Sequence, residues 1–537
     1  MNPCEASPVA DDKSPASGDS QRDDLSEALE RRRLTRDEAR PEAVEKRHAS
    51  GGRTARENLE DLVDHGSFVE YGGLAIAAQR GRREMRELIE RTPADGLIGG
   101  TARVNGELFG TEASACAVLS YDYTVLAGTQ GALGHKKKDR LFELIERMRL
   151  PTVFFAEGGG GRPGDTDYPA VSALDTRAFA LWARLSGLVP RISIVAGRCF
   201  AGNAVIAGSS DLIVATENVS LGMGGPAMIE GGGLGTVEPD EIGPLDMQTA
   251  NGVIDVAVAD EAEAVSVTKR LLSYFQGSTE PGEEPDQARL RDLVPEARRR
   301  AYKVEPVIET LADEGSVTFL RPGFAPEMVT ALCRIEGRPL GVIANNTMVM
   351  AGAITSDGAD KAARLMQLCD AFGLPLLSLV DTPGMMVGPE AEATGLVRHC
   401  CRLMVAGAAL RVPLVSVVLR RGYGLGAQAM VAGSLHEPLL TVGWPSAELG
   451  PMGLEGAVRL GMRRELEAIE DEKERDRRVR ELTEMAERNA KALNAATLFE
   501  LDDVIDPAET RGLISSTLAA ARTAEPPPHA HRFVDTW

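Results

Sequence analysis

TVLAGTQGALGHKKKDRLFELIERMRLPTVFFAEGGGGRPG, residues 124–164, is the stretch that decides the fold, because the chain repeats its pattern farther on. The second copy, MVMAGAITSDGADKAARLMQLCDAFGLPLLSLVDTPGMMVG, occupies residues 348–388, at an offset of about 224 positions. In both copies an apolar run that ends in an acid, Glu157 or Asp381, enters a glycine-rich turn. We therefore expect two large domains of similar fold, related by internal duplication.

Each copy continues into a second apolar run and a second glycine-rich turn. RISIVAG leads to CFAGNA in the first copy, and PLVSVVL leads to GYGLGA in the second. Patterns typical of strand, turn and helix alternate through each half, which is the signature of βαβ units and of the α/β class. Two glycine-lined turns in each half predict paired sites built from backbone N–H groups.

Composition bounds the class of protein. The chain has 537 residues, of which 43% are hydrophobic, and this is enough material for more than one buried core. Its net charge of −21 and pI near 5.0 argue against general nucleic-acid binding. No apolar run approaches the ~20 residues that span a bilayer. The first 25 residues are acidic and rich in Ser and Pro, unlike a signal or transit peptide. We expect a cytoplasmic protein with no membrane span.

Changes in composition predict the domain boundaries. Residues 277–300 carry Pro, Gly and charge with few apolar residues, as an interdomain linker does. We expect a disordered tail over 1–25, an N-terminal domain over 26–276, this linker, a C-terminal domain over 301–527 and a tail over 528–537.

Local patterns predict several elements. Residues 26–65 are charged and helical in period, with breaks at Pro41 and at the glycine pair 51–52. LIGGTARVNGELFG, from residue 97, predicts a hairpin that turns at Asn105-Gly106. A helix is expected near 260–275. Residues 461–493 predict one long charged helix or a helical hairpin, either solvated or serving as a partner-docking arm.

Cysteine usage gives no metal or disulfide signal. The seven cysteines are an odd number without a C-x-x-C pair, so neither a zinc ribbon nor a disulfide scaffold is indicated. Cys400 and Cys401 follow His399 within LVRHCCRLMVAGAAL, an amphipathic helix pattern. We interpret them as packing residues rather than ligands, and we expect no metal site.

Three short motifs have more than one interpretation. GYGLGA, from Gly422, fits the G-x-G-x-x-A dinucleotide fingerprint, but the first half has no such match. GGGGRPGDTD, from Gly158, lacks the Lys and Ser/Thr of a P-loop, yet its glycines suit a close backbone approach to a ligand. GHKKKDR, from Gly134, is a basic cluster at an expected helix start. It suits a phosphorylated ligand tail, and a solvated helix start explains it equally well.

Familiar side-chain catalytic motifs are missing from the sequence. It contains no G-x-S-x-G nucleophile elbow, no H-E-x-x-H and no ATP-binding P-loop. Chemistry run by turns of backbone N–H groups is oxyanion stabilisation, worth about 2.7–4 kcal/mol per donor. Two such turns could stabilise two anions.

The chain resembles the carboxyltransferase (β) subunits of biotin-dependent acyl-CoA carboxylases, the propionyl-, acetyl- and methylcrotonyl-CoA carboxylase group. The resemblance covers roughly residues 40–530 and rests on four stretches: ASGGRTARENLEDLVDHGSFVEYG, GRCFAGNAVIAGSSD, VDTPGMMVGPEAEATGLVRH and RRGYGLGAQAM. It implies two crotonase-like domains, each a ββα superhelix. The site would lie at a subunit interface, with acyl-CoA on the N-terminal domain and carboxybiotin on the C-terminal domain of another protomer.

The resemblance also implies roles for particular residues. One oxyanion hole would use the amides of Ala201 and Gly202, and the other those of Leu425 and Gly426, so that no side-chain base is required. Contacts to CoA would come from Gly131, His135, Lys136, Lys137, Lys138, Gly158, Gly159 and Gly160. Contacts to biotin would come from Gly384, Tyr423, Gly424, Ala427 and Gln428.

The resemblance further implies cofactors and partners. Biotin would arrive on a biotin carboxylase/biotin carrier partner, because this chain has no Met-Lys-Met attachment site. Coenzyme A would be part of the substrate, and the oligomer would be a hexamer, a trimer of dimers.

Departures from the family pattern bear on specificity. Many members have Gly-Gly in the first hole, where this chain has Ala201-Gly202, and AYGGAY in the second, where it has GYGLGA followed by Gln428. Amide donors survive such changes, whereas the shape of the acyl pocket changes. The alternatives are a biotin-dependent decarboxylase or transcarboxylase subunit, a non-catalytic scaffold subunit, and a dehydrogenase using the GYGLGA fingerprint.

Overall fold

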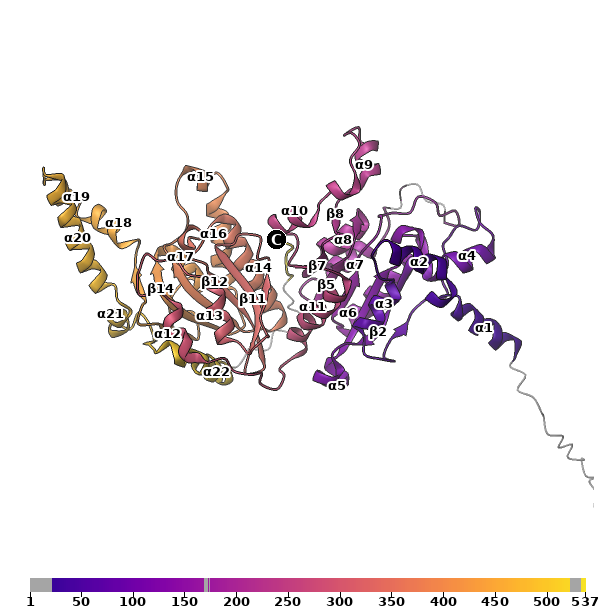
Figure 1. Cartoon of the computed structure of the whole chain (residues 1–537), viewed down its shortest axis with the longest axis horizontal. Coiled ribbons are helices and arrows are strands. Elements are labelled where there is room, and N and C mark those ends of the chain that lie inside the picture. Colours follow the sequence, from indigo (N-terminus) through magenta and orange to yellow (C-terminus); the bar gives the residue numbers. More distant parts are fainter. Residues whose placement is uncertain (1–21, 169–171, 173, 522–532) are drawn as a thin grey trace, which may run out of the picture.

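The structure, a computed structural model, describes residues 22–168, 172, 174–521 and 533–537. Figure 1 shows two α/β bodies side by side, the N-terminal half in indigo to magenta and the C-terminal half in orange to yellow. Residues 1–21 of the expected N-terminal tail, and residues 528–532 of the C-terminal tail, lie outside the described residues.

The N-terminal half is built on a mixed seven-stranded sheet. Its first three strands are antiparallel, and the others run parallel to one another. In spatial order the strands are β1 (Val69–Glu70), β2 (Leu97–Arg103), β3 (Ala115–Tyr121), β4 (Thr152–Phe155), β5 (Arg191–Val195), β7 (Leu212–Thr216) and β9 (Val256–Val258). β6 (Arg198–Phe200) and β8 (Ser220–Gly222) form a separate parallel pair.

The C-terminal half repeats this arrangement. Antiparallel strands again open the sheet, and parallel strands follow. In spatial order they are β10 (Thr318–Leu320), β11 (Met328–Ile335), β12 (Arg338–Asn345), β13 (Leu376–Thr382), β14 (Leu414–Tyr423), β15 (Leu440–Gly443) and β17 (Asp503–Val504). β16 (Glu448–Gly450) pairs with the end of β14, as β8 pairs with β6. The two similar sheets confirm the predicted duplication.

Helix starts and isolated strand bridges repeat at the same offset of 224 residues as the sequence pattern. Helix α6 (Ala132–Met148) and helix α14 (Ser356–Phe372) each have 17 residues and start 224 positions apart. An isolated bridge joins Gln130 to Gly161 in the first half, and its counterpart joins Ile354 to Met385 in the second.

The helices follow the expected breaks at the N-terminus. α1 (Asp23–Arg33), α2 (Pro41–Ala49) and α3 (Ala55–Leu62) are separated at Pro41 and the glycine pair, and α11 (Glu261–Gln276) closes the half. The remaining helices of this half are α4 (Met85–Arg91), α5 (Gly106–Ala113), α7 (Ala178–Arg184), α8 (Gly202–Gly208), α9 (Pro226–Gly231) and α10 (Leu245–Ala250). Those of the second half are α13 (Glu305–Leu311), α15 (Pro389–Glu392), α16 (Leu396–Ala408), α17 (Gly424–Met430), α21 (Ala492–Thr497) and α22 (Thr510–Ala520).

The prediction that a hairpin turns at Asn105-Gly106 is wrong. β2 and β3 do form an antiparallel pair, with Leu97 opposite Tyr121, but α5 lies between them. Asn105 takes a left-handed conformation with φ of 65°, and its side chain donates to Gln276 of α11 at 2.9 Å. The Asn-Gly pair therefore starts a short helix docked on α11 instead of closing a hairpin.

Residues 277–300 pack against the second half. They include α12 (Leu290–Leu293), whose Leu290 is fully buried in the same cluster as Leu311 and Leu340. Arg291 also pairs with Asp506 at 2.5 Å.

Residues 454–489 form a projecting arm of three helices. They are α18 (Leu454–Gly461), α19 (Arg463–Glu467) and α20 (Glu472–Asn489), and they close a small cluster of their own around Val479 and Leu482. The arm, α15 and α9 project from the same edge of the molecule in Figure 1. No helix in the described part of the chain has the length and hydropathy needed to cross a bilayer.

Buried charges join the two halves. Arg364 of α14 is buried and donates to the carbonyl of Asp211 at 2.8 Å, across the domain boundary. Arg321 pairs with Asp255 of the first half at 2.8 Å. One hydrophobic cluster also continues from the first sheet into the second.

Candidate active site

Three turns meet at the carboxyl ends of the first sheet's strands. They are residues 126–131 after β3, residues 158–161 after β4, and residues 200–203 between β6 and α8. The amide of Gln130 donates to Gly160 at 2.7 Å, and the amide of Phe200 donates to Gly158 at 3.0 Å. The middle turn is thereby bonded to both neighbours.

Glycine is required where these turns touch. A Cβ on Gly158 would lie 2.3 Å from the carbonyl oxygen of Gly128, and one on Gly160 would lie 2.8 Å from the Cβ of Ala201. The three predicted ligand-binding amides of this turn all donate within the protein: Gly158 to Arg198, Gly159 to Ala127 and Gly160 to the Asn203 side chain. They brace the turn and are not free donors for a ligand.

The second half has the corresponding turns in closer contact. A Cβ on Gly426 would lie 2.6 Å from the carbonyl carbon of Gly384, so the two backbones touch. The amide of Ile354 donates to the Gly384 carbonyl at 3.0 Å. The Leu425 side chain is 64% exposed and lies beside this contact.

Strand pairing sets which residues of the two halves correspond. Phe200 pairs with Gly222, and Tyr423 pairs with Gly450, just before α8 and α17. The next residues, Ala201 and Gly424, both take positive φ, 52° and 58°. In this segment the offset is thus 223, one less than in α6 and α14.

With the offset of 223, one of the predicted amide donors changes. The Ala201 amide donates to the Gly222 carbonyl at 3.3 Å and is therefore engaged within the protein. Four neighbouring N–H groups have no protein acceptor in the described ranges, and they form equivalent pairs: Gly202 with Asn203, and Leu425 with Gly426. The first pair lies one residue beyond the predicted Ala201-Gly202.

The predicted basic cluster is divided by burial. Lys136 is exposed, with its ammonium 4.0 Å from the ring centre of Tyr168. Lys137 donates to the carbonyls of Ala94, at 3.0 Å, and Leu97. Burial lowers the pKa of Lys137 to about 8. The cluster is therefore not one patch of three free cations.

Lys138 and His135 face the interior. Lys138 is completely buried, its Nζ donates to Gln130 Oε1 at 2.5 Å, and burial lowers its pKa to about 7. Burial, with Lys138 and Arg162 nearby, lowers the pKa of His135 to about 3, so its ring is neutral at pH 7.

Lys137 has a counterpart in the second half. Lys361, 224 residues later, donates to the carbonyl of Phe324 at 2.7 Å and to that of Ala325 at 3.4 Å. Ala94 and Ala325 both have positive φ, 56° and 42°, on the approach to β2 and β11. The same buried lysine thus holds the same strained turn in both halves.

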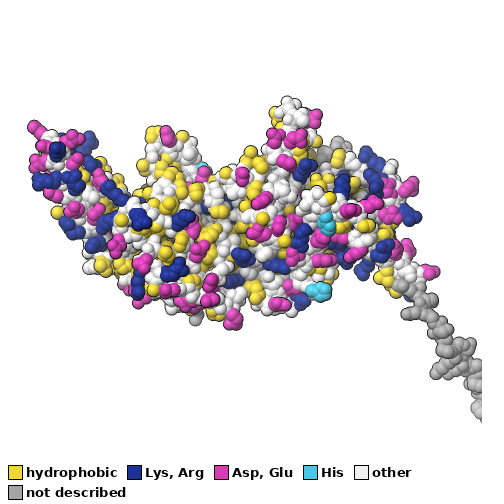
Figure 2. Space-filling view, viewed as in Figure 1, with side chains coloured by type: hydrophobic (Ala, Val, Ile, Leu, Met, Phe, Trp, Pro, Cys, Tyr) yellow, Lys and Arg dark blue, Asp and Glu magenta, His cyan; other side chains and the backbone are white. Residues whose placement is uncertain are grey.

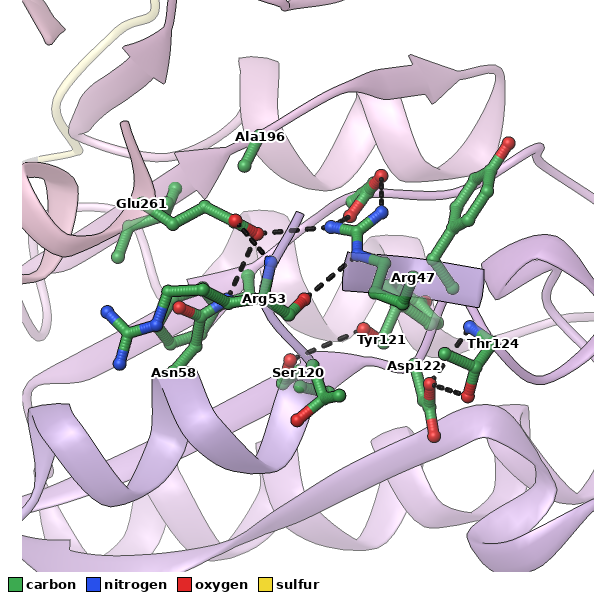
Figure 3. A pocket seen from close by; sticks show the side chains of 15 residues that line it. Arg47, Arg53, Asn58, Ser120, Tyr121, Asp122, Thr124, Ala196 and Glu261 are labelled. Carbon is green, nitrogen blue, oxygen red and sulfur yellow. Dashed lines mark hydrogen bonds and ion pairs between the residues drawn. The ribbon is translucent and has the colours of Figure 1, made fainter. Parts of the chain in front are cut away.

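A buried ion-pair cluster backs the first site. Figure 3 shows Arg47 from α2 beside Glu261 from α11, and Arg47 also forms two bonds to Glu157, at 2.9 and 2.7 Å. Burial raises the pKa of Glu157 to about 7 although Arg47 opposes the shift. This cluster holds the N-terminal segment against the strand that enters the glycine turn.

Apart from Gly384, the residues predicted to contact biotin belong to α17 or directly precede it. Gly424 and Gln428 are accessible, whereas Ala427 and Tyr423 are buried. The Tyr423 hydroxyl donates to Glu448 at 2.8 Å. A dinucleotide site would also need an acid about 20 residues after its glycine motif to bind the ribose. Glu448 stands near that distance but pairs with Arg298 at 2.8 Å, which counts against the dehydrogenase alternative.

Sequence reasoning missed two polar side chains at the first site. The amide groups of Gln130 and Asn203 lie between the three turns and are buried. Asn203 stands directly after Gly202, and that position was the only available signal. On α16, Cys400 is buried and Cys401 is exposed. Across the described ranges, no three His, Cys, Asp or Glu side chains are grouped as metal ligands.

Comparisons with known proteins place this geometry in context. The family described as "Carboxyl transferase domain" matches residues 46–533. The methylmalonyl-CoA carboxyltransferase 12S subunit of Propionibacterium freudenreichii subsp. shermanii is 33% identical over 88% of this chain and 90% of its own length. The biotin-dependent long chain acyl-coenzyme A carboxylase beta4 subunit of Mycobacterium tuberculosis is 32% identical over 93% of this chain and 94% of its own length.

Solved structures agree with these relatives. A single-chain, multi-domain long-chain acyl-CoA carboxylase superposes with a TM-score of 0.88 and 54% identity over 93% of this chain. This chain spans about half, 49%, of that protein's length. The hexameric transcarboxylase 12S, with methylmalonyl-CoA bound, superposes with a TM-score of 0.83 and 30% identity, covering 96% of this chain and 99% of that one.

Proposed function

The chain belongs to the carboxyl transferase domain family, the carboxyltransferase component of biotin-dependent acyl-CoA carboxylases, and on that premise we propose that two pairs of backbone N–H groups carry its reaction. In this proposal a carboxyl group moves from carboxybiotin to the α-carbon of an acyl-CoA through an enolate. The proposal rests on one observation: each half has, at the equivalent position, two adjacent backbone N–H groups without a protein acceptor in the described ranges.

The first pair holds the acyl-CoA. The N–H groups of Gly202 and Asn203 donate to the thioester oxygen, and they bind it more strongly as negative charge develops in the enolate. Their position is braced because the neighbouring turn bonds to both sides of the site. Preorganised donors of this kind need no rearrangement during the reaction.

The second pair holds the biotin ring. The N–H groups of Leu425 and Gly426 donate to the ureido oxygen, and the contact of Gly426 with Gly384 keeps them in place. Carboxybiotin supplies CO2 and then a basic nitrogen for the α-proton. The chain therefore orients two substrates and stabilises two oxyanions without a side-chain base.

CoA contacts are proposed around the start of helix α6 in the first half. Lys136 is the one exposed lysine of the GHKKKDR cluster and suits a phosphate of CoA. Gly131 and the neutral ring of His135 lie at the start of the same helix, α6. Lys137 and Lys138 are assigned to the interior instead, because their ammonium groups already bond to protein oxygens.

A long acyl chain is the substrate class that the surface favours. Met223, Met228 and Leu234 follow β8, the strand that receives the Ala201 amide, and they are 71%, 64% and 77% exposed. Flexible methionine side chains adapt to apolar ligands of varied shape. The 54% identity with a long-chain acyl-CoA carboxylase supports the same assignment.

The proposal includes a biotin-bearing partner and a hexamer. The Mycobacterium tuberculosis relative is biotin-dependent, and the 12S relative forms a hexamer. Hydrophobic side chains lie on the surface of the second half and around α15 (Figure 2), where Val387, Val397 and Val405 are 83%, 63% and 68% exposed. Contact between protomers would cover such a surface.

A reconstituted assay tests the proposed function. The chain is mixed with biotin carboxylase, biotin carrier protein, ATP and labelled bicarbonate, and acyl-CoAs of increasing length are screened. Label should enter long-chain acyl-CoAs best, and no incorporation at any length would overturn the carboxyltransferase assignment. Transfer from methylmalonyl-CoA to biotin without ATP would favour the transcarboxylase alternative. The 33% identity with the 12S carboxyltransferase subunit supports that alternative.

A variant pair isolates the donors. Leu425→Pro removes one N–H near the start of α17, where proline is compatible with helical backbone, while Leu425→Ala keeps the N–H and shortens an exposed side chain. Turnover should fall by about 100-fold or more in the proline variant, as loss of an oxyanion donor does. Near wild-type turnover in the proline variant would exclude a role for this amide. Turnover by the unaltered chain would exclude a non-catalytic scaffold subunit.

A further inference from the structure

We infer that Lys138 is a positioning residue for the acyl-CoA half of the site, acting through the side-chain amides of Gln130 and Asn203. This inference rests on the proposed function of the Gly202 and Asn203 amides. It concerns a buried cation that the reaction itself does not use.

A continuous chain of hydrogen bonds links Lys138 to the turn. Its Nζ donates to Gln130 Oε1 at 2.5 Å, and Gln130 Nε2 donates to Asn203 Oδ1 at 3.2 Å. Asn203 Oδ1 also accepts from the amide of Gly160 at 3.1 Å. Three side chains thereby connect α6 with the turn that carries the proposed oxyanion hole.

The far end of the chain holds the other two turns. Asn203 Nδ2 lies 3.4 Å from the carbonyl oxygens of both Gly128 and Glu157. The Gln130 amide is also packed on Gly202, where a Cβ would lie 2.9 Å from Gln130 Nε2. A rotation of either amide would disturb the backbone beside the proposed donors.

Lys138 and the backbone together fix the direction of the chain of hydrogen bonds. When protonated, Lys138 donates only, so the atom of Gln130 that faces it must be the oxygen, and the NH₂ group must then face Asn203. Asn203 in turn must present its oxygen to Gln130 and its NH₂ to the carbonyls. Backbone groups hold Asn203 from the other end, through the Gly160 N–H and the carbonyls of Gly128 and Glu157, so it is Gln130 whose oxygen loses its donor when the Lys138 ammonium is removed.

Because Lys138 is buried away from water, its ammonium depends on a single hydrogen-bond acceptor. Lys138 is fully buried, and Gln130 is its one hydrogen-bond acceptor in the described part of the chain. Its other neighbours include the rings of Tyr121 and Phe179, with centres 5.7 and 5.5 Å from Nζ. A buried cation is costly unless it is paired, so its presence here needs a reason.

The second half shows that the fold itself does not need this chain. All three members are replaced there by residues without a polar side chain: Ala362 for Lys138, Ile354 for Gln130 and Gly426 for Asn203. The turns are nevertheless bridged in the same way, and Gly426 packs directly on Gly384. The chain thus belongs to the task of the first half.

Two variants test the inference in the full-length protein. Lys138→Met removes the donor but keeps an unbranched apolar side chain among the rings. Gln130→Glu keeps an acceptor for Lys138 but places a second acceptor, in place of the NH₂ donor, against Asn203 Oδ1. Arg147→Met, an exposed change on the same helix, is the control.

The measurements are kcat and KM for the acyl-CoA, and amide hydrogen exchange of the peptides covering 126–131, 157–161 and 200–204. Both test variants should lower kcat at least about tenfold, change KM less than kcat, and speed exchange in all three turns relative to Arg147→Met. If Lys138 needed only a partner for its charge, Gln130→Glu would keep full turnover, and hydrogen exchange in the three turns would be as slow as in the control. That result would show the inference to be wrong.

Hydrogen exchange separates this inference from the proposed function. Faster exchange in the turns of Lys138→Met supports the positioning role even if no acyl-CoA is carboxylated by the wild-type chain. Unchanged exchange together with unchanged kcat overturns it even if the wild-type chain proves to be an active carboxyltransferase.

Discussion

Glu157 and Asp381 occupy the same position in the two halves, and each is a buried acid held by arginine at the entry to a glycine turn. Glu157 pairs with Arg47 at 2.7 Å, and Asp381 pairs with Arg420 at 3.0 Å and Arg421 at 2.7 Å. The balance of charge differs between them. Arg47 serves two carboxylates, since it also pairs with Glu261, whereas Asp381 has two cations.

Replacing Arg47 should destabilise the first half severely. Arg47→Met leaves two buried carboxylates without their cation, which typically costs about 3–5 kcal/mol. Thermal unfolding of the purified variant measures the loss. Arg421→Met is the comparison in the second half and should cost less, because Arg420 still pairs with Asp381.

The same variant should acquire a pH dependence. Burial already raises the pKa of Glu157 to about 7, and loss of Arg47 raises it further. A carboxyl group with a raised pKa binds more protons in the folded state, so folding becomes less stable as pH rises above its ordinary value of 4.5. Arg47→Met should therefore recover part of its melting temperature at pH 5.5 relative to pH 8. Equal deficits at the two pH values would contradict this account.

The buried lysine of the second half predicts the opposite slope. Burial lowers the pKa of Lys361 from its ordinary 10.5 to about 7. Between these values the unfolded chain binds more protons than the folded one, so this lysine makes the free energy of unfolding rise with pH. Lys361→Met should remove that rise, by up to ~1.4 kcal/mol per pH unit. Denaturant titrations at pH 7 and 9 measure the difference, with Lys303→Met, an exposed change, as the control.

A single methyl group should disable the second site. Gly426→Ala places a Cβ 2.6 Å from the carbonyl carbon of Gly384, so the two turns must separate. Carboxyl transfer should fall at least about 100-fold, while the rest of the half keeps its fold. Gly456→Ala on α18 meets no atom within 4 Å and should leave turnover unchanged. Full activity in Gly426→Ala would mean that this contact does not position the donors.

The projecting arm should unfold separately from the body. Leu482 is buried in the small cluster of α18–α20, and that cluster shares no buried residue with the main cores. Leu482→Asp should open the arm to proteolysis within 454–489 while the main melting transition stays in place. Arg480→Asp, an exposed change on the same helix, should not increase cleavage. If the main transition fell as well, the arm would be part of the domain core.

The general architecture could be predicted because it depends on repeated patterns. Apolar runs, glycine turns and the spacing of the two copies carried the α/β class, the duplication and helices such as α6 and α16. The Asn105-Gly106 turn failed because its residues suit both a hairpin and a helix start, and packing on α11 decides between them. Tertiary contacts of that kind are not visible in a local pattern.

The proposed donors could be located from the sequence only to within one residue. A single-residue difference between the copies, lying between β13 and α17, moved the equivalent of Leu425 from Ala201 to Gly202. The lysine cluster looked uniform in the sequence, yet the helix turns Lys136 outward and Lys138 inward. Asn203 escaped notice because a polar residue after a glycine is common on any surface.

Lys137 and Lys361 also record the history of the chain. A buried lysine that holds the same strained turn in both halves is best explained by descent from one ancestor that already had it. After the duplication, either the first half gained Lys138, Gln130 and Asn203, or the second half lost the corresponding polar residues. The present difference between the two halves was then acquired after the duplication.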